Sequence, residues 1–169
     1  SIYYPSQKTE EDVADFNAKL ENGRIVSGTI FKSWMNGTRP LEISYNADGT
    51  MKQTRYNDIS EYDGSDDWDN HTFIWENGYL TKVKCESMDA VSTFAYDKTT
   101  AIPAPFDKAL DLNMLLLLEE AEFFDGTNGE ILNVLAISGK LGTRSKGLIK
   151  EYHCDWTEDT PFTLKMTYK

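Results

Sequence analysis

Apolar and polar residues alternate along most of this chain, and the pattern predicts antiparallel β-strands. The clearest case is Phe162–Lys169, where Phe, Leu, Met and Tyr alternate with Thr and Lys. A period of two places successive side chains on opposite faces, so this segment is expected to be a half-buried strand with one solvated face. The same reasoning predicts strands over residues 24–34, 41–45, 73–75, 79–85, 91–96 and 148–156.

A short phrase occurs twice: a strand with an aromatic residue, an Asx-Gly turn and a second strand. The turns are Asp48-Gly49 and Asn77-Gly78. Glycine has no Cβ and therefore adopts the positive backbone angles that tight hairpins require. The phrase predicts a meander of β-hairpins.

Three segments depart from the strand pattern. Residues 9–20 place Thr9 before an acidic first turn and an apolar face, so they predict a helix. Residues 111–123 are apolar nearly all round at their start, which is typical of a buried helix. Residues 131–137 fit either a short helix or a strand, and the acidic, turn-rich residues 56–70 predict an exposed loop.

These elements predict a mainly β fold, a curved antiparallel meander or partial β-barrel of about eight or nine strands. One or two helices are expected to pack on it or plug it, because a curved sheet must bury its apolar side. We expect one domain over residues 1–169. It divides into an N-terminal helical segment, 1–23, and an antiparallel β body, 24–169, with a helix near 111–123.

The net charge of the chain disfavours two classes of partner. A net charge of -11 disfavours nucleic acid, which requires clustered Lys and Arg, and it disfavours docking on anionic lipid by charge. The most apolar stretch, Leu110–Leu118, is interrupted by Asp111 and Asn113, so we expect no transmembrane segment.

The hairpin motifs resemble those of a known family. Tyr45–Thr50 resembles the tyrosine–aspartate (YD, Rhs-like) repeat unit, and Trp75–Val83 resembles a W-x-N-G-x-L-T-K-V hairpin. Phe94–Asp97 resembles the strand that follows this hairpin, and Leu110–Asn113 and Gly139–Ile149 fit the same group. The chain thus resembles an uncharacterised family of secreted lipoproteins of gut Bacteroidetes, described as having a porin-like β fold.

The resemblance spans residues 41–169 and does not include the N-terminal helical segment. It implies a secreted, outer-membrane or periplasmic lipoprotein whose signal peptide and lipid anchor lie outside the printed residues. The family has no catalytic residues to carry over to this chain.

Residues 63–70 carry alternating oxygen-bearing side chains. Asp63, Asp67 and Asp69 have a spacing that can surround Ca²⁺, which prefers oxygen ligands. The EF-hand pattern is not matched, because Trp68 stands where that motif needs Gly. A Ca²⁺ site and a solvated acidic loop both remain open; we favour the loop and expect no cofactor.

Aromatic residues near this loop suggest a binding surface. Tyr62, Trp68 and Trp75 form a candidate platform on which a sugar ring would stack. Packing in the core explains Trp75 equally well.

The chain has two cysteines and two histidines. Cys85 and Cys154 each lie on an apolar strand face, so they either form a disulfide worth about 3–5 kcal/mol or remain two buried thiols. His71 and His153 belong to no His-x-x-x-His or Cys-x-x-Cys motif, so zinc is not expected.

The sequence carries no G-x-S-x-G elbow and no Walker loop, so we expect a protein that is not an enzyme. The function that fits is a secreted or cell-surface domain that binds a glycan, a peptide or an apolar ligand. The alternatives are a structural subunit of an envelope complex and, third, a hydrolase. The sequence names neither the ligand nor the oligomeric state.

Overall fold

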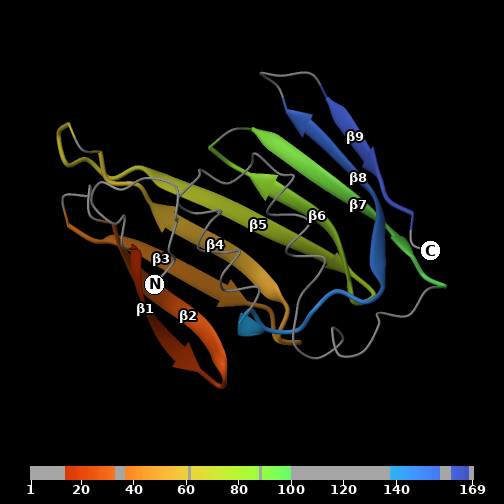
Figure 1. Cartoon of the computed structure of the whole chain (residues 1–169), viewed down its shortest axis with the longest axis horizontal. Helices are drawn as coiled ribbons and strands as arrows, with labels where there is room; N and C mark the ends of the chain where they lie inside the picture. The colour runs from red at the N-terminus through yellow and green to blue at the C-terminus, as the bar shows by residue number, and fades with distance from the viewer. Residues whose placement is uncertain are drawn as a thin grey trace, which may run out of the picture.

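The computed structural model is a nine-stranded antiparallel sheet (Figure 1). It describes residues 14–32, 37–60, 62–87, 89–99, 138–156 and 161–167. The strands are β1 (Ala14–Glu21), β2 (Arg24–Lys32), β3 (Arg39–Tyr45), β4 (Met51–Asn57), β5 (Trp68–Glu76), β6 (Tyr79–Cys85), β7 (Ala90–Asp97), β8 (Leu148–Trp156) and β9 (Phe162–Lys165). Each strand pairs with its neighbour in sequence, in the order β1 to β9. The predicted curved antiparallel meander is confirmed.

The alternation of the sequence sets the two faces of this sheet. In β3, Arg39, Leu41 and Ile43 are buried, whereas Glu42 and Ser44 are exposed. The buried hydrophobic cluster that these faces form comprises Ile25, Ile30, Leu41, Ile43, Met51, Tyr56, Phe73, Leu80, Val83, Cys85, Ala90, Phe94, Tyr96, Leu141, Ile149, Tyr152 and Cys154. We call the side that carries this cluster the core face and the opposite side the outer face.

The predicted helix over residues 9–20 is wrong for its described part, because residues 14–20 belong to β1. Asn22 and Gly23 both have positive φ, 51° and 75°, and close a two-residue hairpin that pairs β1 with β2. The ring of Phe16 lies over Gly28 of β2, where a larger residue has no room. Pairing with β2 therefore overrides the helical pattern.

The loop predicted over residues 56–70 is shorter, because β4 continues to Asn57 and β5 starts at Trp68. Asn57 and Trp68 face each other in the ladder. The Asn57 amide holds the loop closed: its Nδ2 donates to Asp66 Oδ1 at 2.8 Å, and its Oδ1 accepts from the Asp67 amide at 3.0 Å. These bonds explain why polar residues end the two strands here.

A bulge in β8 explains the exposure of Lys150, which strict alternation with Leu148 and Tyr152 would place on the buried face. Ala95 of β7 pairs with Glu151, whereas Tyr96 pairs with Ile149, so Lys150 is an extra residue. The bulge buries Ile149 and leaves Lys150 exposed. The helix predicted over residues 111–123 and the ambiguous segment 131–137 lie outside the described residues.

Residues 138–147 run along one end of the sheet before entering β8, as the light-blue trace shows (Figure 1). The amide of Thr143 donates to Gly49 O at 2.8 Å, and the amide of Lys146 donates to Gly78 O at 2.9 Å. Both acceptors lie in the Asx-Gly turns of the recurring phrase. We call residues 138–147 the crossing segment, because it joins the turn after β3 to the turn after β5.

Candidate functional site

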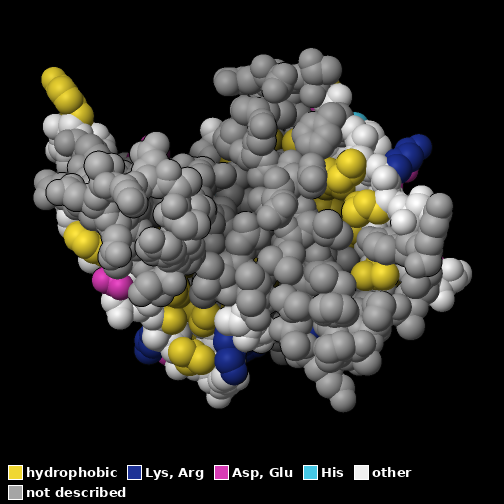
Figure 2. Space-filling view, in the orientation of Figure 1, with side chains coloured by type: hydrophobic (Ala, Val, Ile, Leu, Met, Phe, Trp, Pro, Cys, Tyr) yellow, Lys and Arg dark blue, Asp and Glu magenta, His cyan; other side chains and the backbone are white. Residues whose placement is uncertain are grey.

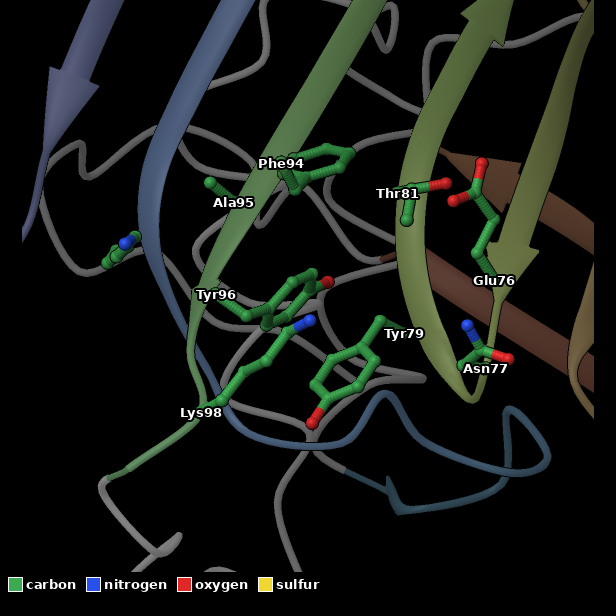
Figure 3. Close-up of a pocket in the computed structure, with 9 residues that line it drawn as sticks. Glu76, Asn77, Tyr79, Thr81, Phe94, Ala95, Tyr96 and Lys98 are labelled. Atoms are coloured by element: carbon green, nitrogen blue, oxygen red, sulfur yellow. The ribbon is translucent and has the colours of Figure 1, made fainter.

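A cleft opens where β6 and β7 separate. The β6–β7 ladder runs from Cys85–Ala90 to Lys82–Thr93, and the cleft lies beyond its last pair. It has a volume of about 280 Å³. Its lining consists of Glu76, Asn77, Tyr79, Thr81, Phe94, Ala95, Tyr96, Lys98 and Lys150 (Figure 3).

Side chains replace the missing ladder bonds at this point. Tyr96 Oη donates to Leu80 O at 2.6 Å, and the Leu80 amide donates to Ser145 Oγ at 3.0 Å. Both polar groups of the Leu80 backbone are thus satisfied without the main chain of β7. At Leu80 the two strands therefore separate without leaving a main-chain group unpaired.

Aromatic rings form the floor of the cleft. The rings of Tyr79 and Tyr96 lie 5.1 Å apart at 51°, and Phe94 stacks behind on Tyr152 at 5.4 Å. Phe94 and Tyr96 are buried, whereas Tyr79 is half-buried. Tyr79 therefore offers the ring surface that a bound molecule would touch.

Charged and hydrogen-bonding groups surround this floor. Lys98 Nζ lies 5.0 Å from the centroid of the Tyr79 ring, and the Lys98 side chain runs beside both tyrosines (Figure 3). Glu76 and Thr81 stand on the β5–β6 side, opposite Lys98 (Figure 3). Two lysines, Lys98 and Lys150, line a cleft in a protein whose net charge is -11.

The residues that line the cleft include neither Ser, Cys nor His among the part of the chain that the structure describes. The arrangement holds donors, acceptors and a ring surface. It can therefore bind and orient a polar molecule with a flat face.

A second hollow, of about 440 Å³, lies on the outer face of β2 to β4. Its charged groups are paired with each other, since Arg55 Nη1 lies 3.2 Å from Glu42 Oε2. None of the described residues that line it is aromatic. This hollow therefore has fewer groups that could bind a ligand than the cleft between β6 and β7 has.

The predicted aromatic platform is not assembled. Tyr62 is 99 % exposed in the loop between β4 and β5, where Figure 2 shows one hydrophobic side chain projecting from the surface. The ring of Trp68 covers the Arg55 guanidinium at 4.3 Å. Trp75 lies about 23 Å further along β5, packs against the core and donates from Nε1 to Met51 O at 2.7 Å. The interpretation of Trp75 as a core residue is the correct one.

The predicted calcium ligands do not converge. Asp63 makes its hydrogen bonds within the loop, where its Oδ1 accepts from the Ser65 amide at 3.0 Å and from the Ser65 hydroxyl at 2.7 Å. These bonds lower the pKa of Asp63 to about 2. Asp67 is exposed in the same loop, whereas Asp69 is part of β5 and lies beside His71. The start of β5 at Trp68 is what separates Asp69 from the other two.

Cys85 and Cys154 are both buried, as expected, but no disulfide joins them. Cys85 pairs with Ala90 and Cys154 pairs with Ser92, so β7 lies between the two cysteines. Two strand spacings separate them by about 10 Å, and a disulfide needs Cα atoms within about 7 Å. His153 is half-exposed and its Nδ1 lies 2.8 Å from Thr163 Oγ.

The sheet is similar to that of a known protein. A porin-like protein from Bacteroides uniformis ATCC 8492 superposes with a TM-score of 0.62 and 20% sequence identity, over 95% of this chain. This chain spans 58% of the length of that protein. A DUF3836 family protein from Parabacteroides distasonis ATCC 8503 matches 52% of this chain and 77% of its own, with a TM-score of 0.34 and 15% identity.

No family model and no curated protein matches the sequence. The likeness to the porin-like protein therefore establishes the fold. Among the helices of the described part of the chain, none has the length and apolar character needed to cross a bilayer.

Proposed function

We propose that this chain is a non-catalytic binding domain of the cell envelope or cell surface, and that its ligand is an acidic sugar unit held in the cleft between β6 and β7. The observation that carries the proposal is the half-buried Tyr79 ring with Lys98 beside it, in a cleft that Lys150 also lines. A sugar ring stacks on an aromatic face through its C–H groups. A carboxylate on that sugar would accept charge-assisted hydrogen bonds from Lys98 and Lys150.

The size of the cleft supports a small ligand. Its volume of about 280 Å³ lies just below the usual range for small-molecule sites, which suits one sugar unit better than a long segment of peptide. Glu76 and Thr81, on the other side, offer acceptors for sugar hydroxyl groups. A neutral apolar ligand would leave the lysines without a role.

The envelope setting rests on separate support. The hairpin motifs resemble those of secreted Bacteroidetes lipoproteins, and the sheet resembles that of a porin-like protein from the same group of bacteria. A scaffold role in an envelope complex is the alternative, and the binding experiment distinguishes the two.

The test is a glycan array that includes uronate-containing and neutral sugars, followed by calorimetry on the purified chain. We expect acidic glycans to bind and their neutral counterparts to bind at least about tenfold more weakly, a difference of about 1.4 kcal/mol. Lys98→Gln and Tyr79→Ala should each weaken binding by about tenfold, through loss of the ion pair and of the ring surface.

The chain offers matched controls for both changes. Lys84 is an exposed lysine on β6 and Tyr62 an exposed tyrosine in the loop between β4 and β5, and both lie outside the cleft lining. Lys84→Gln and Tyr62→Ala should leave the affinity unchanged. Absence of any glycan binding, or equal losses in the control variants, would refute the cleft as the site. Turnover of a glycan substrate would refute the non-catalytic assignment.

A further inference from the structure

Three different metal-binding side chains meet at the far end of β6 from the cleft. Asp69 and His71 are two residues apart on β5, so their side chains share the core face. Cys85, the last residue of β6, is the direct cross-strand partner of His71. Their ligand atoms all lie within 4.8 Å of one another.

The distances from Asp69 to the other two side chains are close to the donor spacing of a tetrahedral metal site. His71 Nδ1 lies 3.6 Å from Asp69 Oδ2, and Cys85 Sγ lies 3.6 Å from Asp69 Oδ1. Zinc bonds of about 2.0–2.3 Å at tetrahedral angles place neighbouring donor atoms about 3.3–3.8 Å apart. The two contacts are made by different oxygens of Asp69, so its carboxylate must rotate for one oxygen to join the imidazole and the thiolate on one ion.

The donor set selects the class of metal. A thiolate, an imidazole and a carboxylate suit Zn²⁺, whereas Ca²⁺ and Mg²⁺ take oxygen ligands. The site is enclosed: His71 is 0 % exposed, Cys85 2 % and the Asp69 side chain 14 %. The partial exposure of Asp69 leaves room on that side for water as a fourth ligand.

Ser87 supports the cluster from the turn after β6. Its Oγ donates to Asp69 Oδ1 at 2.6 Å and lies 3.3 Å from Cys85 Sγ. Hydrogen bonds of this kind orient the ligands of metal sites. They orient Asp69 equally well in a simple Asp–His pair without metal, and the experiment must separate these two cases.

We propose that Asp69, His71 and Cys85 bind one Zn²⁺ ion, which ties the start of β5 to the end of β6. Binding releases the thiol proton of Cys85, and the carboxylate and thiolate together balance the charge of the ion. The site is independent of the proposed ligand cleft, because the cleft lies at the opposite end of β6.

The experiment uses the full chain, reduced and stripped of metal, and titrates it with Co²⁺ as a coloured substitute for Zn²⁺. We expect a thiolate-to-cobalt charge-transfer absorption that saturates at one equivalent and disappears when Zn²⁺ displaces the cobalt. Cys85→Ser should abolish this absorption, and Asp69→Asn and His71→Gln should weaken zinc binding by at least about tenfold.

The cysteine and the histidine each have an internal control, because the second cysteine and the second histidine lie on β8. Cys154→Ser and His153→Gln should keep the absorption and the affinity. Equal loss in the control variants, or no cobalt absorption with the unaltered chain, would refute the site. A second measurement needs no variant: Zn²⁺ should raise the melting temperature of the unaltered chain, and equimolar Ca²⁺ should not. An equal response to both ions, or to neither, also refutes the proposal.

Discussion

The two ends of the sheet are held in different ways. At one end, which we call the turn end, the Asx-Gly turns accept main-chain hydrogen bonds from the crossing segment, distant in sequence. At the other, the loop end, the described residues between β4 and β5 bond within the loop and to Asn57. The Ser60 amide donates to Ser65 O at 2.9 Å, and the Asp67 amide donates to Asn57 Oδ1 at 3.0 Å. A disruptive substitution at the turn end should therefore destabilise the whole sheet, whereas one at the loop end should affect only the loop.

A pair of glycine substitutions should show the largest contrast. Gly142 of the crossing segment has φ of +80°, and a Cβ there would clash with Gly49 O and come within 2.7 Å of the Tyr45 ring. Gly142→Ala should lower the free energy of unfolding by about 2–4 kcal/mol, since it adds a clash to backbone strain. Gly64, at the loop end, has φ of +70° with nothing near its Cβ position. Gly64→Ala should cost only about 1 kcal/mol. Urea denaturation measures both, and equal losses would contradict the comparison.

Two serine substitutions should show a smaller contrast. Ser145 is buried at the turn end, and its Oγ accepts the Leu80 amide. Ser145→Ala leaves that amide without its acceptor and should cost about 1–3 kcal/mol. Ser65 is exposed at the loop end, so Ser65→Ala should cost less than about 0.5 kcal/mol. Thermal unfolding checks both, and a larger loss for Ser65→Ala would reverse the assignment of the two ends.

The smallest effects concern pH. Burial raises the pKa of Tyr45, whose hydroxyl donates to Ile25 O at 2.6 Å, to about 12. Because this pKa lies above the unfolded value of 10.0, the contribution of Tyr45 is complete below pH 10 and is lost as the pH rises towards 12. Tyr45→Phe should remove this alkaline decline in stability.

Asp63, at the loop end, behaves in the opposite sense. Hydrogen bonds from Ser65 lower its pKa from 3.8 to about 2, so its contribution is present above pH 3.8 and is lost as the pH falls to 2. Asp63→Asn should flatten this acid decline slightly, because the group is exposed. Denaturation curves at pH 2–4 and pH 9–12 measure both; an acid effect of Asp63 larger than the alkaline effect of Tyr45 would contradict the comparison.

Local patterns predicted the elements that depend on them. The alternation in β3 and the Asn77-Gly78 turn are short-range features, and both are present as expected. The predicted helix over residues 9–20 was wrong for its described part, because β1 is an edge strand with a largely exposed surface, so its sequence carries little strand periodicity. Its strand state depends on pairing with β2, which no single segment reveals.

Both candidate sites depend on the pairing register between neighbouring strands, and the sequence of a single strand does not determine that register. The cleft exists because the β6–β7 ladder ends at Lys82. Beyond that point the Leu80 amide donates its hydrogen bond to Ser145 Oγ, 65 positions away in the sequence, and not to β7. The Asp69, His71 and Cys85 cluster was missed because residues 56–70 were interpreted as a loop. Had β5 been extended back to Asp69, the shared face of Asp69 and His71 would have been visible, but the pairing of His71 with Cys85 would still have required the β5–β6 register.

The order of the strands has a consequence for how the chain folds. Among the described residues, β1 to β7 each pair with the next strand across a short connection, so these hairpins can form one after another. The pairing of β7 with β8 is long-range, because residues 98–147 lie between them. The crossing segment also connects distant residues: Thr143 Oγ bonds to Asp48 O across 95 positions in the sequence. Closing so long a loop is entropically costly until the strands between are paired. The turn end should therefore be assembled late, after the meander that it secures.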